Sequence, residues 1–267
     1  MPAHSRHMHR SEHAGWVMAS FRDTSPSVRY FVDLAANHPR EGSSTYELEQ
    51  HGWTGLCIEP NPAYASLLRA QRNCTVMDVA IDSMAHNVSF EFSRGAMGGI
   101  VDQRFDNRPD AGVEKHPIQA VTLRRALRSA HAPHVVDYLS LDVEGAETAV
   151  LPSTFPWESF TFLTLTIERP PPDLNARLFR HGYLFARTIG IADVAYVHRR
   201  HPNAATVSAN HSFVQVPAKC RSHEKPFVDR QRLHGVRCGS IFGCCAFPGF
   251  PQSTTPYMRA HDGASAD

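Results

Sequence analysis

The sequence predicts an α/β fold, a doubly wound and mostly parallel sheet with helices on both faces. Short apolar runs that end near an acidic residue recur along the chain. Stretches with helical spacing and capping residues lie between them. This alternation continues from about residue 30 to residue 198. It indicates parallel strands, because a parallel pair needs a long crossover connection that is usually a helix.

Each expected strand in the first half of the chain is an apolar run bounded by residues that break it. These strands cover residues 30–34, 55–59, 74–81 and 88–92. The last of them alternates in polarity and can be an excursion from the main sheet. A helix is expected over residues 44–50, where Ser43 or Ser44 is the N-cap. Pro60 and Pro62 end the second strand and open the next helix.

The second half of the chain continues the alternation. Strands are expected over residues 135–141, 160–167, 183–188 and 194–198, and helices over residues 122–130, from 146 onward and over 174–181. Gly182 ends the last helix, and the two final strands are close enough in sequence to form a hairpin. Residues 93–117 show little periodicity, so a long loop is expected there. Within it, residues 94–108 are either a mobile lid over a binding site or an ordinary surface loop.

Three segments of the chain differ in composition. Residues 1–28 are expected to be a flexible leader, residues 29–200 to form the α/β domain, and residues 201–267 to form a Cys-containing, Pro- and Gly-rich extension. The histidines of the leader are His4, His7, His9 and His13. A solvated tail is favoured over a metal site for them, because no cysteine or carboxylate completes a set of ligands.

The overall charge and hydropathy exclude some classes of partner. Lys and Arg total 27, and Asp and Glu total 26, so no net field favours nucleic acid or an anionic membrane. The chain has no apolar run of roughly 18 residues, the length that spans a bilayer. Its N-terminus also lacks the apolar segment of a secretory signal. A soluble protein, cytoplasmic by default, is therefore expected, and nothing in the sequence indicates an oligomeric state.

The six cysteines are too sparse for a disulfide scaffold. Cys57 and Cys74 lie inside apolar stretches and are expected to be reduced core residues. The others lie in the tail: Cys220, Cys238, Cys244 and Cys245. Free thiols or a loose disulfide are favoured there over a zinc site, because no C-x-x-C pair is present.

Acidic residues end four of the expected strands: Asp33, Glu59, Asp142 and Glu168. In an open parallel sheet, ligands bind beyond the carboxyl ends of the strands, near the switch in strand order, so these side chains are expected to share one crevice. The simpler alternative is that each acid caps the helix that follows. Because Asp33 and Glu59 end consecutive strands, a nucleoside site is favoured, with Glu59 accepting hydrogen bonds from both ribose hydroxyls. The absence of a G-x-G-x-x-G motif argues against a dinucleotide.

Three stretches carry a resemblance to a known family. They are YFVDLAANHP, SSTYELEQHGWTGLCIEPNP and DYLSLDVEGAETAVL. Together they resemble the FkbM family of methyltransferases over about residues 30–198. The resemblance implies a Rossmann-like methyltransferase fold, S-adenosylmethionine as the methyl donor, and O-methylation of a hydroxyl on a sugar or small-molecule acceptor. Ala35 stands where the family has glycine, and a positive φ there would strain it by roughly 1 kcal/mol.

The expected donor site contains six residues: Asp33, Ala35, Asn37, Ser44, Glu59 and Asp78. Ala35 and Asn37 belong to a turn of small residues that lets the backbone approach a ligand closely. Ser44 either contacts the carboxylate of the donor at a helix N-terminus or only caps that helix. Asp78, at the third strand, either meets the adenine amine or is an ordinary turn acid.

Asp142, Glu144 and Glu168 are the expected catalytic residues. Methyl transfer to an alcohol requires removal of the hydroxyl proton, which a carboxylate can accept. A divalent metal held by the same carboxylates would serve the same purpose. The direct base is favoured, because the spacing of these acids matches no metal-binding loop. Two other functions stay open: a methyltransferase-like interaction module with little or no activity, and a nucleotide-dependent oxidoreductase.

Overall fold

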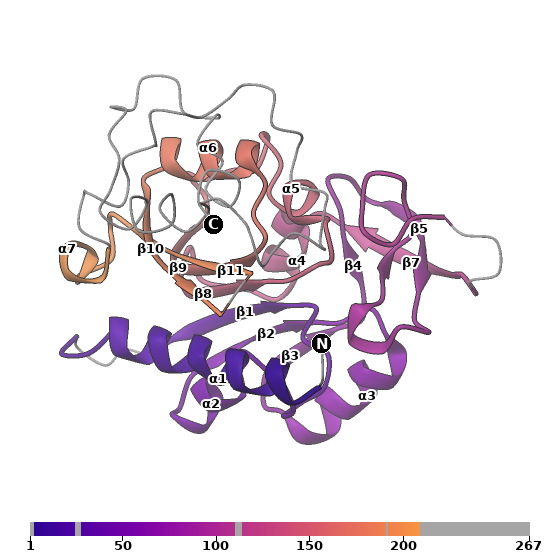
Figure 1. The fold of residues 1–267 in the computed structure, drawn as a ribbon, viewed down its shortest axis with the longest axis horizontal. Coiled ribbons are helices and arrows are strands. Elements are labelled where there is room, and N and C mark those ends of the chain that lie inside the picture. Colours follow the sequence, from indigo (N-terminus) through magenta and orange to yellow (C-terminus); the bar gives the residue numbers. More distant parts are fainter. Residues whose placement is uncertain (1–2, 25–27, 110–113, 191, 209–267) are drawn as a thin grey trace, which may run out of the picture.

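The structure is a computed structural model that describes residues 3–24, 28–109, 114–190 and 192–208. Its larger sheet has seven strands in the order β10-β11-β9-β8-β1-β2-β3 (Figure 1). These strands are β1 (Tyr30–Leu34), β2 (Thr54–Ile58), β3 (Thr75–Met77), β8 (Val135–Leu141), β9 (Thr161–Glu168), β10 (Tyr183–Ile189) and β11 (Asp193–His198). Neighbours from β3 through β9 pair in parallel, whereas β11 is antiparallel to both β9 and β10. The chain therefore has the predicted α/β class, with a mostly parallel main sheet.

Helices pack against both faces of this sheet. They are α1 (Ala3–Ser20), α2 (Tyr46–Gln50), α3 (Pro62–Gln71), α4 (Leu123–Ser129), α5 (Glu147–Val150), α6 (Pro172–Arg180) and α7 (Ala204–Val207). The first three lie on one side of the main sheet, and α4, α5 and α6 lie on the other (Figure 1). Successive side chains of a strand point to opposite faces, so Phe31 belongs to the core that contains Leu48 of α2. Its neighbour Val32 belongs to the core that contains Leu127 of α4.

Side-chain caps fix the starts of two helices that follow strands. Asn61 accepts a hydrogen bond from the backbone N–H of Ala63 at the start of α3, where Pro62 occupies the first turn. Thr122 accepts a hydrogen bond from the backbone N–H of Arg125 at the start of α4. Such caps set the direction in which the chain leaves a strand, and thereby the position of the residues at the strand end.

A second sheet of four strands corrects two of the sequence predictions. Its strands are β4 (Ala80–Ile81), β5 (His86–Glu91), β6 (Gly99–Ile100) and β7 (His116–Val121), in the order β4-β7-β5-β6. The strand expected over residues 74–81 is divided, because β3 pairs with β2 and β4 pairs with β7. The stretch 93–117 is not a plain loop, since it contains β6 and the start of β7. Glycine is required at Gly98, because a Cβ there would overlap the carbonyl oxygen of Glu91.

The N-terminal segment differs from the flexible leader expected over residues 1–28. It forms α1, and Ala14, Val17 and Phe21 are buried in the core beside α2. These apolar positions recur every three or four residues, which is the spacing of one helix face, but the mostly polar residues 4–13 that precede them hide it. His13 contacts Asp193 of β11, with 3.0 Å between Nε2 and Oδ2. The side chains of His4, His7 and His9 lie outside the described part of the chain.

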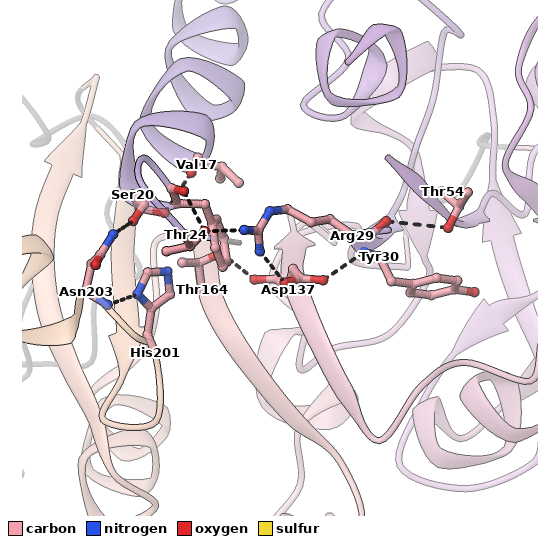
Figure 2. A network of polar contacts seen from close by, with 11 residues as sticks. Val17, Ser20, Thr24, Arg29, Tyr30, Thr54, Asp137, Thr164, His201 and Asn203 are labelled. Atoms are coloured by element: carbon pink, nitrogen blue, oxygen red, sulfur yellow. Dashed lines mark hydrogen bonds and ion pairs between the residues drawn. The ribbon is translucent and has the colours of Figure 1, made fainter. Parts of the chain in front are cut away.

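Polar contacts join this segment to the middle and the end of the domain (Figure 2). Arg29 donates to Asp137 of β8, with 2.9 Å between NH1 and Oδ1, and also to the hydroxyl of Thr24. The side-chain amide of Asn203 donates to the carbonyl oxygens of Ser20 and Arg22, both at 2.9 Å. Residues that are far apart in the sequence therefore close the domain at one edge.

A disulfide corrects the prediction of reduced core cysteines. Cys57 and Cys74 are bonded, and their Cα atoms lie 6.0 Å apart, which is an ordinary separation for a disulfide. Cys57 lies in β2 and Cys74 directly precedes β3, so the parallel pairing of these strands brings the two side chains into the same core. The tail cysteines and the extension from residue 209 onward lie outside the described residues. Within the described part of the chain, no helix is long and apolar enough to cross a membrane.

Candidate active site

The candidate site lies at the carboxyl ends of the parallel strands β1, β2, β8 and β9. β1 is flanked by β2 on one side and by β8 on the other. The chain proceeds from β1 toward β3 in one direction and from β8 toward β9 in the other, so strand order switches beside β1. Loops that leave such a switch point in opposite directions open a crevice, which is where ligands bind in open α/β sheets.

The loop after β1 has the backbone conformation that makes glycine favourable. Ala35 has a φ of 55° and Asn37 a φ of 54°, both in the left-handed region. Ala35 therefore has the positive φ that strains an L-residue with a Cβ. The side-chain amide of Asn37 donates to the carbonyl oxygen of Ala35 at 2.8 Å. Asp33 precedes this turn, is 1% exposed, and accepts a hydrogen bond from the Thr45 hydroxyl at 2.6 Å.

Glu59 faces the same turn from the end of β2. Its carboxylate is buried and accepts hydrogen bonds from the backbone N–H groups of Asn37 at 2.8 Å and Asn61 at 2.7 Å. Burial raises the pKa of Glu59 to about 7, and it outweighs these two hydrogen bonds, which lower the pKa. The structure thus brings together three of the predicted donor residues, Asp33, Asn37 and Glu59, with the Ala35 turn between them.

Ser44 and Asp78 occupy different surroundings. Ser44 is buried, and its hydroxyl lies 3.3 Å from Nδ1 of His13. The N-cap of α2 is Thr45, not Ser43 or Ser44 as predicted, although the Ser43 hydroxyl accepts a hydrogen bond from the backbone N–H of Tyr46 at 3.1 Å. Asp78 has a 59% exposed side chain that pairs with Arg69 at 2.9 Å. The roles predicted for Ser44 and Asp78 in donor binding stay predictions.

A buried arginine that the sequence analysis missed holds the loop after β1 in place. The Arg72 side chain is fully buried, and its Nε donates to Glu49 Oε2 at 3.1 Å. Its other nitrogens donate to the hydroxyls of Ser43 at 3.2 Å and Thr45 at 3.0 Å. Thr45 in turn donates to Asp33. Arg72 thereby connects the end of α3 to the strand end where the nucleoside site is expected, and no local sequence pattern marks it.

The three predicted catalytic carboxylates converge. One carboxylate oxygen from each of Asp142, Glu144 and Glu168 lies within 4.8 Å of the others. Asp142 directly follows β8, Glu144 lies in the next turn with a φ of 54°, and Glu168 ends β9. Burial, followed by the charge of Asp142, raises the pKa of Glu168 well above its ordinary value. Their proximity was predicted, and their catalytic role stays a prediction.

Arg169 supplies a positive charge to this cluster and was not predicted. Its NH2 group lies 2.7 Å from Glu168, 2.9 Å from Asp106 and 3.4 Å from Glu144. Burial opposes the charged form, but the surrounding carboxylates outweigh it and raise the pKa of Arg169 above its ordinary value. Its φ of 43° is left-handed, and strained backbone of this kind is common at functional sites. Asp106 and Glu144 come from distant segments, so no sequence spacing could have indicated these two contacts.

A cavity of about 630 Å³ adjoins the carboxylate cluster. Residues 103–106 and Arg108 line it, as do residues 147–149 of α5, and Gly145 and Arg169 connect the cavity to the strand ends. Glu147 of α5 also lines it; its carboxyl is buried and accepts from the backbone N–H of Gly145 at 3.2 Å. Burial raises the pKa of Glu147 to about 7. The segment 94–108, expected to be a lid or a surface loop, therefore contributes a wall to a cavity beside the site.

The cluster of Asp142, Glu144 and Glu168 also meets the chemical preference of hard divalent cations, which bind carboxylate oxygens. It is the one group of this kind within the described residues. Arg169 contacts two of its members, so part of the negative charge that would attract a cation is already balanced.

Comparison with models of protein families gives a match. Residues 33–185, more than half of the chain, match a family model described as the methyltransferase FkbM domain. The matched range begins at Asp33 and includes Glu59, all three carboxylates of the cluster and Arg169. A search of curated proteins gives no significant match.

Proposed function

The chain belongs to the FkbM methyltransferase family, and on that premise we propose that it is an O-methyltransferase. It transfers a methyl group from S-adenosylmethionine to a hydroxyl on a sugar or other small-molecule acceptor. The observation that carries this proposal is the position of Glu59 and the cluster of Asp142, Glu144 and Glu168 at the same end of the sheet, on the two sides of the switch point. A Rossmann-like, doubly wound arrangement belongs to the same proposal.

In this proposal, the loop after β1 and the end of β2 hold the donor. Glu59 accepts hydrogen bonds from the ribose hydroxyls through the lone pairs that Asn37 and Asn61 leave open. The turn at Ala35 and Asn37 lets the backbone approach the methionine part, and Asp33 supports the turn. Ser44 and Asp78 contribute at the carboxylate and adenine ends. The donor supplies an electrophilic methyl group on a sulfonium centre.

The carboxylate cluster acts on the acceptor. The acceptor oxygen forms a bond to the methyl carbon, the carbon–sulfur bond breaks with its electron pair going to sulfur, and a carboxylate of the cluster takes the hydroxyl proton. The raised pKa of Glu168 makes its carboxylate a stronger base than an exposed glutamate. The positive charge of Arg169 offsets the negative charge of the carboxylates that it contacts during this step. If a divalent metal takes part instead, Asp142, Glu144 and Glu168 are the residues that would hold it.

Methyl transfer from labelled S-adenosylmethionine to a panel of sugars and natural-product alcohols tests the proposal. We expect activity that survives EDTA and falls at least about a hundredfold in Asp142→Asn, the loss typical of a missing general base. Glu158→Gln, an exposed acid outside the site, is the matched control and should keep full activity. Loss of activity on chelation, with recovery in magnesium, would replace the direct base by the metal mechanism. Full activity in Asp142→Asn would remove this residue from the chemistry.

The left-handed φ of Ala35 favours a second candidate, a methyltransferase-like interaction module that binds the donor weakly. Thermal shifts with S-adenosylhomocysteine, ATP and NADH separate the two candidates, because a ligand raises the melting temperature only if it binds the native state. An enzyme should be stabilised by S-adenosylhomocysteine alone. A chain that no nucleoside stabilises, and that methylates nothing in the panel, would be the interaction module.

A further inference from the structure

We propose that the cavity beside the carboxylate cluster binds the acceptor, and that the acceptor is a hydroxyl-bearing oxyanion, such as a sugar phosphate or a sugar acid, whose acidic group is held by Arg108. This inference rests on the proposed methyltransferase function and adds the substrate class. The cavity measures about 630 Å³, within the range of small-molecule sites.

The walls of the cavity suit a polar ligand. Side chains with hydroxyl, amide or charged groups outnumber the apolar ones that line it. The uncharged polar ones are Ser83, Gln103 and Thr148, and the larger apolar ones are Phe105 and Pro171. A molecule with several hydroxyl groups finds donors and acceptors on such walls, whereas an extended apolar acceptor would displace the water around these groups without replacing its hydrogen bonds.

Most of the charged side chains on the walls of the cavity are paired, and one positive side chain has no partner among the described residues. The charged residues are Arg104, Arg108, Arg169, Asp106 and Glu147. Arg169 is paired with Asp106, and Arg104 makes a two-point pair with Asp102, with both N–O distances 2.9 Å. The pKa of Glu147 is raised by burial to about 7, so its carboxyl is only partly charged at neutral pH. Arg108 makes no ion pair or hydrogen bond with any residue that the structure describes.

The backbone around Arg108 is ordered by neighbouring hydrogen bonds. Asn107 is 3% exposed, and its carbonyl oxygen accepts from the backbone N–H of Asp102 at 3.0 Å. The backbone N–H of Asp106 donates to the carbonyl oxygen of Glu144 at 3.1 Å, so this loop is bonded to the turn that carries Glu144. The arginine is therefore presented from a loop whose position is fixed relative to the carboxylate cluster, as a specificity residue requires.

The lining of the cavity combines residues from two parts of the chain. Arg104 and Arg108 belong to the loop 103–108, whereas Gly145 and Arg169 follow Glu144 and Glu168 in the sequence. An acceptor that carries both an acidic group and a hydroxyl would be oriented if Arg108 held its acid. Its acid would meet a planar guanidinium, the side chain best matched to carboxylate and phosphate groups, and its hydroxyl would lie toward Asp142, Glu144 and Glu168.

Equilibrium binding to the full chain tests the inference without any turnover. Glucose 6-phosphate, glucuronate and methyl glucoside are titrated by calorimetry or by ligand-detected NMR. We expect at least one of the two acidic sugars to bind at least tenfold more tightly than methyl glucoside, and the better one identifies phosphate or carboxylate as the preferred group. Arg108→Gln should reduce that preference at least fivefold, while Arg108→Lys should keep part of it because the positive charge remains.

Arg124→Gln provides the matched control, because Arg124 is exposed on α4 and lines no part of the cavity. It removes the same charge and should leave the preference unchanged. Equal binding of all three sugars, no binding of either acidic sugar, or an unchanged preference in Arg108→Gln would overturn the inference. S-adenosylhomocysteine is titrated in parallel. If it binds while the acidic sugars show no preference, only the inference fails; if it does not bind, the proposed function itself fails.

Discussion

Among single residues, Glu59 links protonation to donor binding. Its pKa of about 7 results from burial that outweighs two backbone hydrogen bonds, so the carboxyl is about half ionised at neutral pH. Ribose hydroxyls donate best to the ionised form. We therefore expect the affinity for S-adenosylhomocysteine to rise about tenfold between pH 6 and pH 8, as one group with this pKa ionises, when it is measured by calorimetry at several pH values.

Replacement of Glu59 provides the control for this pH dependence. Glu59→Gln should weaken binding by roughly 1.5–3 kcal/mol, the usual range for a hydrogen bond to a charged group, and should leave the remaining affinity independent of pH over this range. A pH profile that is unchanged in Glu59→Gln would assign the titration to another group and would remove Glu59 as the ribose acceptor.

At Ala35, by contrast, a substitution should increase both the stability of the protein and its affinity for the donor. Its φ of 55° is one that an L-residue adopts at a cost and glycine adopts freely. Ala35→Gly should raise the free energy of unfolding by up to roughly 1 kcal/mol, less the entropy that glycine adds to the unfolded chain, and should tighten donor binding. Ala36→Gly is the control, because Ala36 is buried and lacks a positive φ, so it should lose stability. A looser donor in Ala35→Gly would contradict the strain argument.

Glu147 determines part of the pH dependence of stability. Burial raises its pKa in the folded protein to about 7 from an ordinary value of 4.5. Between these values the folded state binds more protons than the unfolded state, so this residue's contribution is fully present below pH 4.5 and is lost as pH rises through 7. Glu147→Gln should therefore be more stable than the natural protein at pH 8, by on the order of 1–3 kcal/mol, and nearly equal to it at pH 4. Urea unfolding at both pH values measures this difference.

At the scale of elements, Arg72 connects α3 to α2 and to the loop after β1. Its side chain and that of Glu49 are both buried, so removal of the arginine leaves a buried carboxylate without its counter-ion. Arg72→Met should lower the free energy of unfolding by about 3–5 kcal/mol, measured by urea denaturation. The double variant with Glu49→Met should recover much of the stability, because it removes the uncompensated charge.

Donor binding distinguishes two roles for Arg72. If it positions the loop that carries Asp33 and Ala35, the double variant should remain folded but bind S-adenosylhomocysteine more weakly, because the contact with Thr45 is lost. An unchanged affinity in a stable double variant would show that Arg72 contributes only to stability.

The elements also show what the sequence can and cannot predict. β1 and β8 were predicted with correct bounds, since each is an apolar run closed by residues that break it. α1 was missed because its buried face consists of a few apolar residues among many polar ones. The disulfide of Cys57 and Cys74 depends on which strands pair, and strand pairing is a property of the folded chain. The acids at strand ends were predictable, because parallel strands end at the same edge of a sheet. The contact of Arg169 with Asp106 was not, because Asp106 reaches the site from the loop between β6 and β7.

For the molecule as a whole, the last described residues contact the N-terminal segment and the edge of the main sheet. Asn203 binds the end of α1, while Ala204 and Val207 pack near β10 and β11. A chain that ends at residue 208 should therefore fold with a cooperative urea transition, whereas one that ends at residue 199 should lose on the order of 2–4 kcal/mol, since several hydrogen bonds and partly buried apolar contacts are removed. A non-cooperative transition for the longer chain would show that residues 209–267 are needed to cover an apolar face.

The position of β11 has a consequence for how the chain is made. β11 is the last strand among the described residues, yet it lies between β9 and β10. On the ribosome, β10 emerges first and has no neighbour to pair with, because the strand that joins it to the sheet has not yet been translated. Before β11 forms, β9 and β10 each expose unpaired backbone groups on the side that β11 will occupy. The carbonyl oxygen of Ser20, at the end of α1, also lacks its contact with Asn203. Since the contact between Asn203 and Ser20 spans 183 residues, closure of the domain must follow synthesis of nearly the whole described chain. Until then, these unpaired edges are the parts of the nascent chain that aggregate most readily.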